Sequence, residues 1–117
     1  MATPKIVTQT APQDVRVHIG CDGDKITVDP DPFWIYRCAN EQVRWVCVQH
    51  HVHGDAGHPC FKVHFDEPTD PPFTMEQFEG QALSGRPTSK AVDHKLYKYT
   101  VTVQGKAPLD PDGGVKP

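Results

Sequence analysis

Histidine and cysteine are concentrated in one short stretch of the sequence. Five of the seven histidines and two of the four cysteines fall between Cys47 and His64. Imidazole and thiolate are good ligands for zinc and copper, so this stretch is the first place to look for chemistry. Cys47-x2-His50 would end one strand and His58-x-Cys60 would begin the next. If these strands are neighbours, the four side chains form a Cys2His2 site for zinc or copper. The alternate ligands are His51, His53 and His64.

The same residues also fit a structural interpretation. Cys47 shares one face of a predicted strand with Val43 and Trp45, and it would then be a core residue. The histidines would be solvated in a polar loop, where several of them near their ordinary pKa would repel one another once charged. The four cysteines (Cys21, Cys38, Cys47 and Cys60) could be buried thiols, metal ligands or two disulfides of undetermined pairing. The sequence leaves these alternatives open.

The elements that would position this stretch are short strands. Alternating apolar residues predict strands near residues 15–19, 26–28, 33–37, 43–48, 61–65 and 96–103. Twelve prolines and nine glycines among 117 residues argue for many turns and against long helices. Thr74-Met75-Glu76-Gln77 has the form of a capping box, which predicts one short helical turn at 75–79.

These patterns predict one all-β domain, a two-sheet Greek-key sandwich of cupredoxin-like or immunoglobulin-like type. The domain would span residues 15–105, between a flexible N-terminal segment (1–14) and a flexible C-terminal tail (106–117). The expected core is apolar and alternates along the strands. Its members are Val15, Val17, Ile26, Val28, Val43, Trp45, Phe61, Val63, Phe65, Tyr99, Val101 and Val103.

The order of these elements resembles the cupredoxin-like family. The resemblance covers about residues 15–105 and rests on the Val43-Arg44-Trp45 strand, the histidine loop after it and the closing Tyr97-Lys98-Tyr99 strand. It implies a β-sandwich fold. In that family the turn after the closing strand supplies a Cys, a His and usually a Met to copper, and here no such residues follow Tyr99. We therefore expect no blue-copper centre.

Charge and hydropathy exclude several partners. The net charge is −3, and no run of basic residues is available for nucleic acid or anionic lipid. No apolar stretch is long enough to span a membrane. The first residues lack the pattern of a signal peptide, which predicts a soluble cytoplasmic protein. No nucleophile–base motif surrounds Ser84 or Ser89, so the sequence offers no specific argument for an enzyme.

Trp34 and Tyr36 have two interpretations, an exposed aromatic platform for a carbohydrate or peptide, or ordinary core residues of a strand. The function that we expect is a non-catalytic binding module for a protein or small ligand. Loops 49–60 and 66–94 would form its recognition end. The alternative is a copper- or zinc-binding protein that uses the histidine and cysteine residues of segment 47–64.

Overall fold

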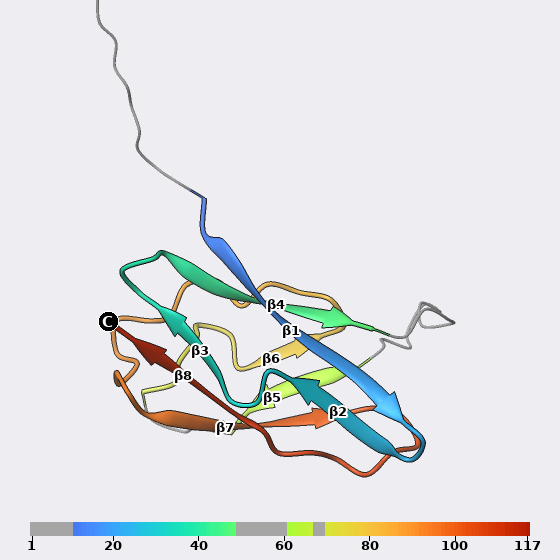
Figure 1. Cartoon of the computed structure of the whole chain (residues 1–117). Helices are drawn as coiled ribbons and strands as arrows, with labels where there is room; N and C mark the ends of the chain where they lie inside the picture. The colour runs from blue at the N-terminus through green and yellow to red at the C-terminus, as the bar shows by residue number, and fades with distance from the viewer. Residues whose placement is uncertain (1–10, 49–60, 67–69) are drawn as a thin grey trace, which may run out of the picture.

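The computed structural model describes residues 11–48, 61–66 and 70–117. Every element among them is a β-strand, arranged in two sheets (Figure 1), which confirms the predicted all-β, two-sheet fold. The eight strands are β1 (Gln13–Asp22), β2 (Lys25–Asp29), β3 (Phe33–Tyr36), β4 (Glu41–Cys47), β5 (Lys62–Phe65), β6 (Gln77–Glu79), β7 (Leu96–Thr102) and β8 (Asp112–Lys116). No helix in the described part of the chain could cross a membrane.

The smaller sheet has the strand order β2-β1-β4. β1 and β2 form an antiparallel hairpin in which Asp22 pairs with Lys25 across two residues, and Gly23 adopts a φ of 63°. Glycine at the first central position of a two-residue hairpin turn is favoured because it reaches positive φ without steric cost. β1 and β4 run parallel, with Val17 beside Trp45.

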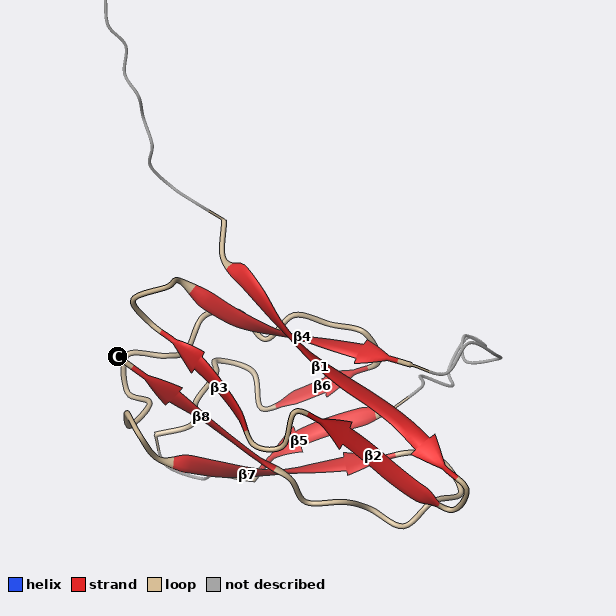
Figure 2. Cartoon of the chain, in the orientation of Figure 1, coloured by secondary structure: helices blue, strands red, loops and turns tan. Residues whose placement is uncertain are grey.

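The larger sheet has the order β3-β8-β7-β5-β6. β8 lies between β3, to which it is parallel, and β7, to which it is antiparallel (Figure 2). β3, from the first third of the chain, is therefore paired with the last strand, β8. The two sheets pack face to face, and their inward side chains form the core.

Alternation along the strands places the core where the sequence predicts it. In β7, Tyr97, Tyr99 and Val101 are buried, whereas Leu96 and Lys98 are exposed. The predicted core residues that are buried are Val17, Ile26, Val43, Trp45, Phe61, Val63, Phe65, Tyr99 and Val101. The remaining three, Val15, Val28 and Val103, are partly buried against them.

Aromatic rings occupy the middle of this core. The ring centroid of Trp45 lies 5.4 Å from that of Tyr99, 5.8 Å from that of Phe78 and 5.9 Å from that of Phe33. Phe65 stacks on Tyr99 at 5.0 Å. Pairs of this kind contribute about 0.5–1.5 kcal/mol each beyond the burial of their area. Trp45, on β4 of the smaller sheet, therefore packs against rings that come from the larger sheet.

The predicted helical turn at 75–79 is wrong. Residues Gln77–Glu79 form β6, which pairs with β5, and the amide of Phe65 donates to the carbonyl of Glu76 at 2.8 Å. Phe78 is 3% exposed and packs against Trp45 and Phe65. Burial of this ring requires an extended backbone beside β5, and that tertiary contact outweighs the local capping pattern.

The C-terminal segment also differs from its prediction as a flexible tail, because Asp112–Lys116 forms β8. Both glycines of this strand are buried. A Cβ at Gly113 would collide with the ring of Phe33, and one at Gly114 would collide with the ring of Trp34. These two glycines belong to the segment that is predicted as a flexible tail. Because they have no side chains, two neighbouring aromatic rings can approach the strand.

Candidate binding site on the outer face of the larger sheet

The predicted Cys2His2 site falls mostly outside the described residues. His50, His58 and Cys60 lie there, as do the alternates His51 and His53. Cys47, at the end of β4, is half-buried and disulfide-bonded. A disulfide sulfur carries no thiolate charge, so Cys47 could ligate a metal only after reduction. Cytoplasmic thiols are kept reduced, whereas disulfides persist in oxidising compartments, so the metal hypothesis requires a reducing environment.

His64 is the one alternate ligand that the structure places. It lies on β5, and its Nδ1 is 2.8 Å from Oδ1 of Asp66. The hydroxyl of Thr100 lies 3.1 Å from Oδ2 of Asp66 and 3.0 Å from Oδ1 of Asp110, so its single proton is shared between two acceptors. Among the described residues, no group of three or more His, Cys, Asp or Glu side chains could hold a metal ion.

The described part of loop 66–94 is held against the sandwich. Residues 82–84 line the edge of β4, where the amide of Trp45 donates to the carbonyl of Ala82 and the amide of Ser84 donates to that of Val43. The hydroxyl of Ser84 accepts a hydrogen bond from the amide of Val43 at 2.8 Å. These contacts satisfy backbone groups that a bare strand edge would leave unpaired.

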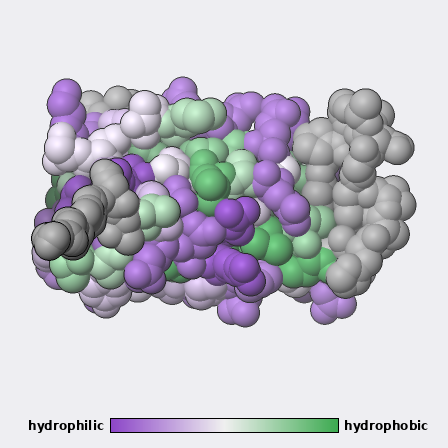
Figure 3. All heavy atoms as spheres, turned by 90° about the horizontal axis from the view of Figure 1, so that it is seen from above, coloured by the Kyte–Doolittle hydropathy of each residue, from purple (hydrophilic) through white to green (hydrophobic). Residues whose placement is uncertain are grey.

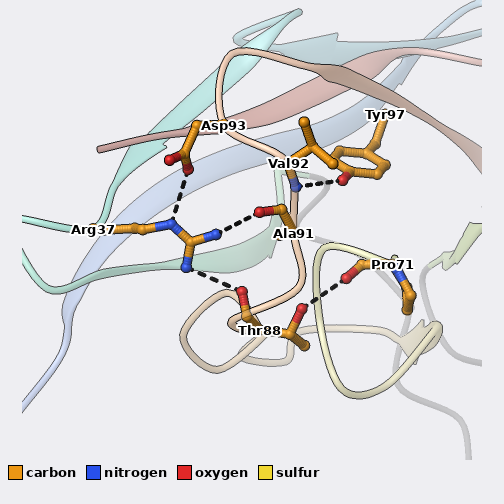
Figure 4. A network of polar contacts seen from close by, with 7 residues as sticks. All are labelled: Arg37, Pro71, Thr88, Ala91, Val92, Asp93 and Tyr97. Atoms are coloured by element: carbon orange, nitrogen blue, oxygen red, sulfur yellow. Dashed lines mark hydrogen bonds and ion pairs between the residues drawn. The ribbon is translucent and has the colours of Figure 1, made fainter. Parts of the chain in front are cut away.

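Arg37, just after β3, fixes the next part of this loop (Figure 4). Its guanidinium donates to Asp93 at 2.9 Å and to the carbonyls of Thr88 and Ala91 at 3.0 and 2.8 Å. The hydroxyl of Tyr97 accepts from the amide of Val92 at 2.8 Å. Three donors of the rigid guanidinium thus bind two backbone carbonyls and a carboxylate, and these hydrogen bonds hold residues 88–93 in place.

A surface pocket of about 150 Å³ adjoins this network. It is lined by Arg37, Asn40, Glu41, Arg86 and Pro87. Some of its polar atoms have partners in the protein, since Arg86 donates through Nη1 to the side chain of Asn40 at 3.0 Å and Glu41 accepts from the amide of Tyr36 at 2.8 Å. These two hydrogen bonds fix the side chains that line the pocket at this end of the sandwich.

Aromatic side chains lie on the outer face of the larger sheet, close to this network. Along β3 the side chains alternate, so Phe33 and Ile35 are buried, Trp34 is half-buried and Tyr36 is 42% exposed. Trp34, Gly114 and Leu96 are paired residues on three adjacent strands, and Tyr36 pairs with Lys116 in the next row. We call Trp34, Tyr36, Leu96 and Lys116, grouped around Gly114, the outer-face patch.

The indole of Trp34 lies against the sheet because Gly114 has no side chain. A Cβ at Gly114 would overlap the six-membered ring of Trp34. Lys116 places its Nζ 4.7 Å from the centroid of the same ring, a cation–π contact. Leu96 is 45% exposed at the other side of the glycine. The result is a low apolar surface with one ammonium group over the indole ring.

The outer face of the smaller sheet has a different character. Its side chains include Asp14 and Arg44, which form an ion pair of 2.7 Å, together with the exposed Arg16 and His18. The hydrogen bond from Arg44 holds the pKa of Asp14 below its ordinary value. Figure 3, which looks down on the molecule from above, shows hydrophilic residues interspersed with apolar areas. Large aromatic side chains on an outer sheet face are thus a feature of β3.

Sequence reasoning identified part of the outer-face patch and missed the rest. It singled out Trp34 and Tyr36 as a platform or as core, and the exposure of Tyr36 favours the platform. It missed Gly114 and Lys116, because residues 106–117 are predicted as a tail. It missed Leu96, which lies in the predicted strand 96–103, because only its pairing with Gly114 brings it near Trp34. The available signal was the pair of adjacent glycines before Val115, since glycine within a strand often marks the close approach of another group.

No protein-family model, no curated protein and no solved structure matches this chain. The comparisons therefore assign no family, and the cupredoxin-like or immunoglobulin-like assignment stays a prediction. The function has to be argued from the geometry of the chain itself.

Proposed function

We propose that this protein is a non-catalytic binding module and that its ligand binds to the outer-face patch. The observation that carries the proposal is the indole of Trp34, laid against the backbone of Gly114 beside the exposed Tyr36 and Leu96. Core packing explains why Phe33 and Ile35 are apolar, but it gives no reason for large apolar side chains at the alternate positions of β3. A ligand that covers these side chains does give one.

The size of the outer-face patch favours a small ligand. Three adjacent strands about 4.8 Å apart, crossed by two rows of outward residues about 7 Å apart, make a surface on the order of 100–200 Å². A stable protein–protein interface buries about 800 Å² on each partner. The outer-face patch alone is far below that size, and it matches the face of one or two six-membered rings.

The contacts of the polar side chains support a binding role over a catalytic one. The most suggestive pair is His64 with Asp66, and the hydroxyl nearest to that pair belongs to Thr100, which contacts the carboxylates of Asp66 and Asp110. A nucleophile needs a base to accept its proton, and that base must contact it directly. In the described part of the chain, His64 makes its side-chain contact with Asp66 and not with a hydroxyl or thiol.

Nuclear magnetic resonance gives a direct test, because the chain contains only two tryptophans. A library of small ring compounds (sugars, nucleosides, aromatic acids and short peptides) is titrated into ¹⁵N-labelled protein. We expect members of at least one class to shift the indole N–H signal of Trp34 while that of the buried Trp45 stays in place. Shifts confined to other residues, or no shifts with any class, would remove the proposal.

A further inference from the structure

One cationic side chain lies within the outer-face patch, and the structure gives it no anionic partner. Lys116 contacts the ring of Trp34 and forms no ion pair among the described residues. Its cationic neighbours differ, since Lys98 pairs with Asp112 at 3.3 Å and Arg37 pairs with Asp93 at 2.9 Å. The outer-face patch therefore combines an aromatic face with one positive charge that no carboxylate of the described residues pairs with.

The aromatic face selects for a ligand with polarised C–H groups. The π face of an indole is negative, so it attracts the slightly positive hydrogens on the flat side of a sugar ring. An apolar ligand gains most in an enclosed pocket, where its whole surface leaves water. The outer-face patch is shallow, which suits a sugar, because the hydroxyl groups around the ring stay hydrated while one face stacks.

The positive charge selects among sugars. The ammonium group of Lys116 is the mobile end of a four-carbon stem, so it can leave the indole and meet an anion beside the ring. A carboxylate on the sugar would sit at about the distance from the stacked ring that the lysine reaches. Resting on the function proposed above, we infer that the outer-face patch binds an acidic carbohydrate: a uronic-acid ring stacks on Trp34 and its carboxylate pairs with Lys116.

A matched pair of ligands tests this inference. The probes are tri-galacturonic acid and its methyl ester, which has the same rings without the negative charges. Both are titrated into the full chain, with calorimetry for affinity and the indole signals of Trp34 and Trp45 for location. We expect the acid to shift the Trp34 signal and to bind more tightly than the ester, by about two- to fivefold for one exposed ion pair.

Variants separate the two contacts. Trp34→Ala should weaken binding of both probes at least about tenfold, because the stacking surface is lost. Lys116→Met keeps the aliphatic stem, so it should reduce the affinity for the acid to that for the ester. Lys62→Met removes a charge from β5 in the same sheet, away from the outer-face patch, and should change neither affinity. An unchanged Trp45 signal in each variant shows that the core is intact, and Trp34→Leu provides a second variant if Trp34→Ala does not fold.

The outcomes distinguish this inference from the proposed function. If nucleosides or peptides shift the Trp34 signal and neither sugar probe does, the carbohydrate assignment is wrong and the binding site stands. If the acid and the ester bind equally well, the pairing with Lys116 is wrong. If no ring compound of any class shifts Trp34, both the inference and the proposed function are wrong.

Discussion

On each face of the β3–β8 pair an aromatic ring packs over a glycine, but the two rings have different surroundings. On the inner face Phe33 packs over Gly113 and is 1% exposed among the rings of Trp45 and Tyr99. On the outer face Trp34 packs over Gly114, and no strand of the described chain covers it. The first arrangement is explained by core stability. The second arrangement leaves apolar surface exposed to water, and we attribute it to the ligand that is proposed to bind there.

The largest expected difference is between truncations of the two rings. Phe33→Ala should lower the free energy of unfolding by about 3–5 kcal/mol, because it removes a fully buried aromatic side chain and leaves a cavity. Trp34→Ala should cost about 1 kcal/mol or less, because its ring is covered on one side only. Urea denaturation of both variants measures the two losses. Equal losses would mean that Trp34 is a core residue and that the outer-face patch has no separate role.

Both glycines beneath the rings should be costly to replace, for different reasons. Gly113→Ala should destabilise the protein by about 1–3 kcal/mol, because Phe33 has no space in the core to move into. Gly114→Ala should cost a similar amount, because Trp34 can turn outward into water but the added Cβ would still lie 2.5 Å from the backbone carbonyl oxygen of Lys95. Acrylamide quenching of tryptophan fluorescence should rise in Gly114→Ala, since Trp45 stays buried in both variants. A negligible loss for Gly114→Ala would contradict the close approach of the Lys95 carbonyl to this glycine.

These glycines also mark the limit of what the sequence could predict. Alternation in segments such as Tyr97–Val101 is local information, and it was enough for six strands and the core. The pairing of β8 with β3 joins residues about 80 positions apart, and the local glycine signal at Gly113-Gly114 becomes informative only once these residues are known to form a strand. For the same reason the sequence raised Trp34 and Tyr36 as candidates without their partners Leu96 and Lys116.

Tyr99 offers a smaller test, directed at the inner face alone. Its hydroxyl is buried and finds no hydrogen-bond partner among the residues that the structure describes, and the same holds for Nε1 of Trp45. Tyr99→Phe keeps the ring and removes the unsatisfied group, so we expect stability to stay equal or to rise by up to about 1 kcal/mol. Thermal melting at neutral pH measures this change. A clear loss of stability would show that a water or another group satisfies the hydroxyl in solution.

The same variant should change the alkaline stability of the protein. Burial, together with the nearby charges of Asp31 and Asp112, raises the pKa of Tyr99 far above its ordinary value near 10. The unfolded phenol therefore ionises first, and stability that is fully present below pH 10 falls as the pH rises above it. Tyr99→Phe should lose less stability between pH 9 and pH 11 than the wild type. Parallel curves for the two proteins would mean that the Tyr99 hydroxyl is accessible to solvent.

Zinc should produce the smallest effect, and it tests the other region in which the sequence predicts function. In the oxidised protein Cys47 is disulfide-bonded, so we expect added zinc to leave the melting temperature unchanged. In the reduced protein, zinc binding at the predicted site of Cys47, His50, His58 and Cys60 would raise the melting temperature with the logarithm of zinc concentration.

Cys47→Ser is the control, because it removes one thiolate from that site and leaves the outer-face patch intact. A zinc response that is lost in Cys47→Ser would establish the metal site as a second binding site, in addition to the outer-face patch. If the reduced wild type does not respond, the Cys2His2 prediction is wrong, and the argument for ligand binding rests on the outer-face patch.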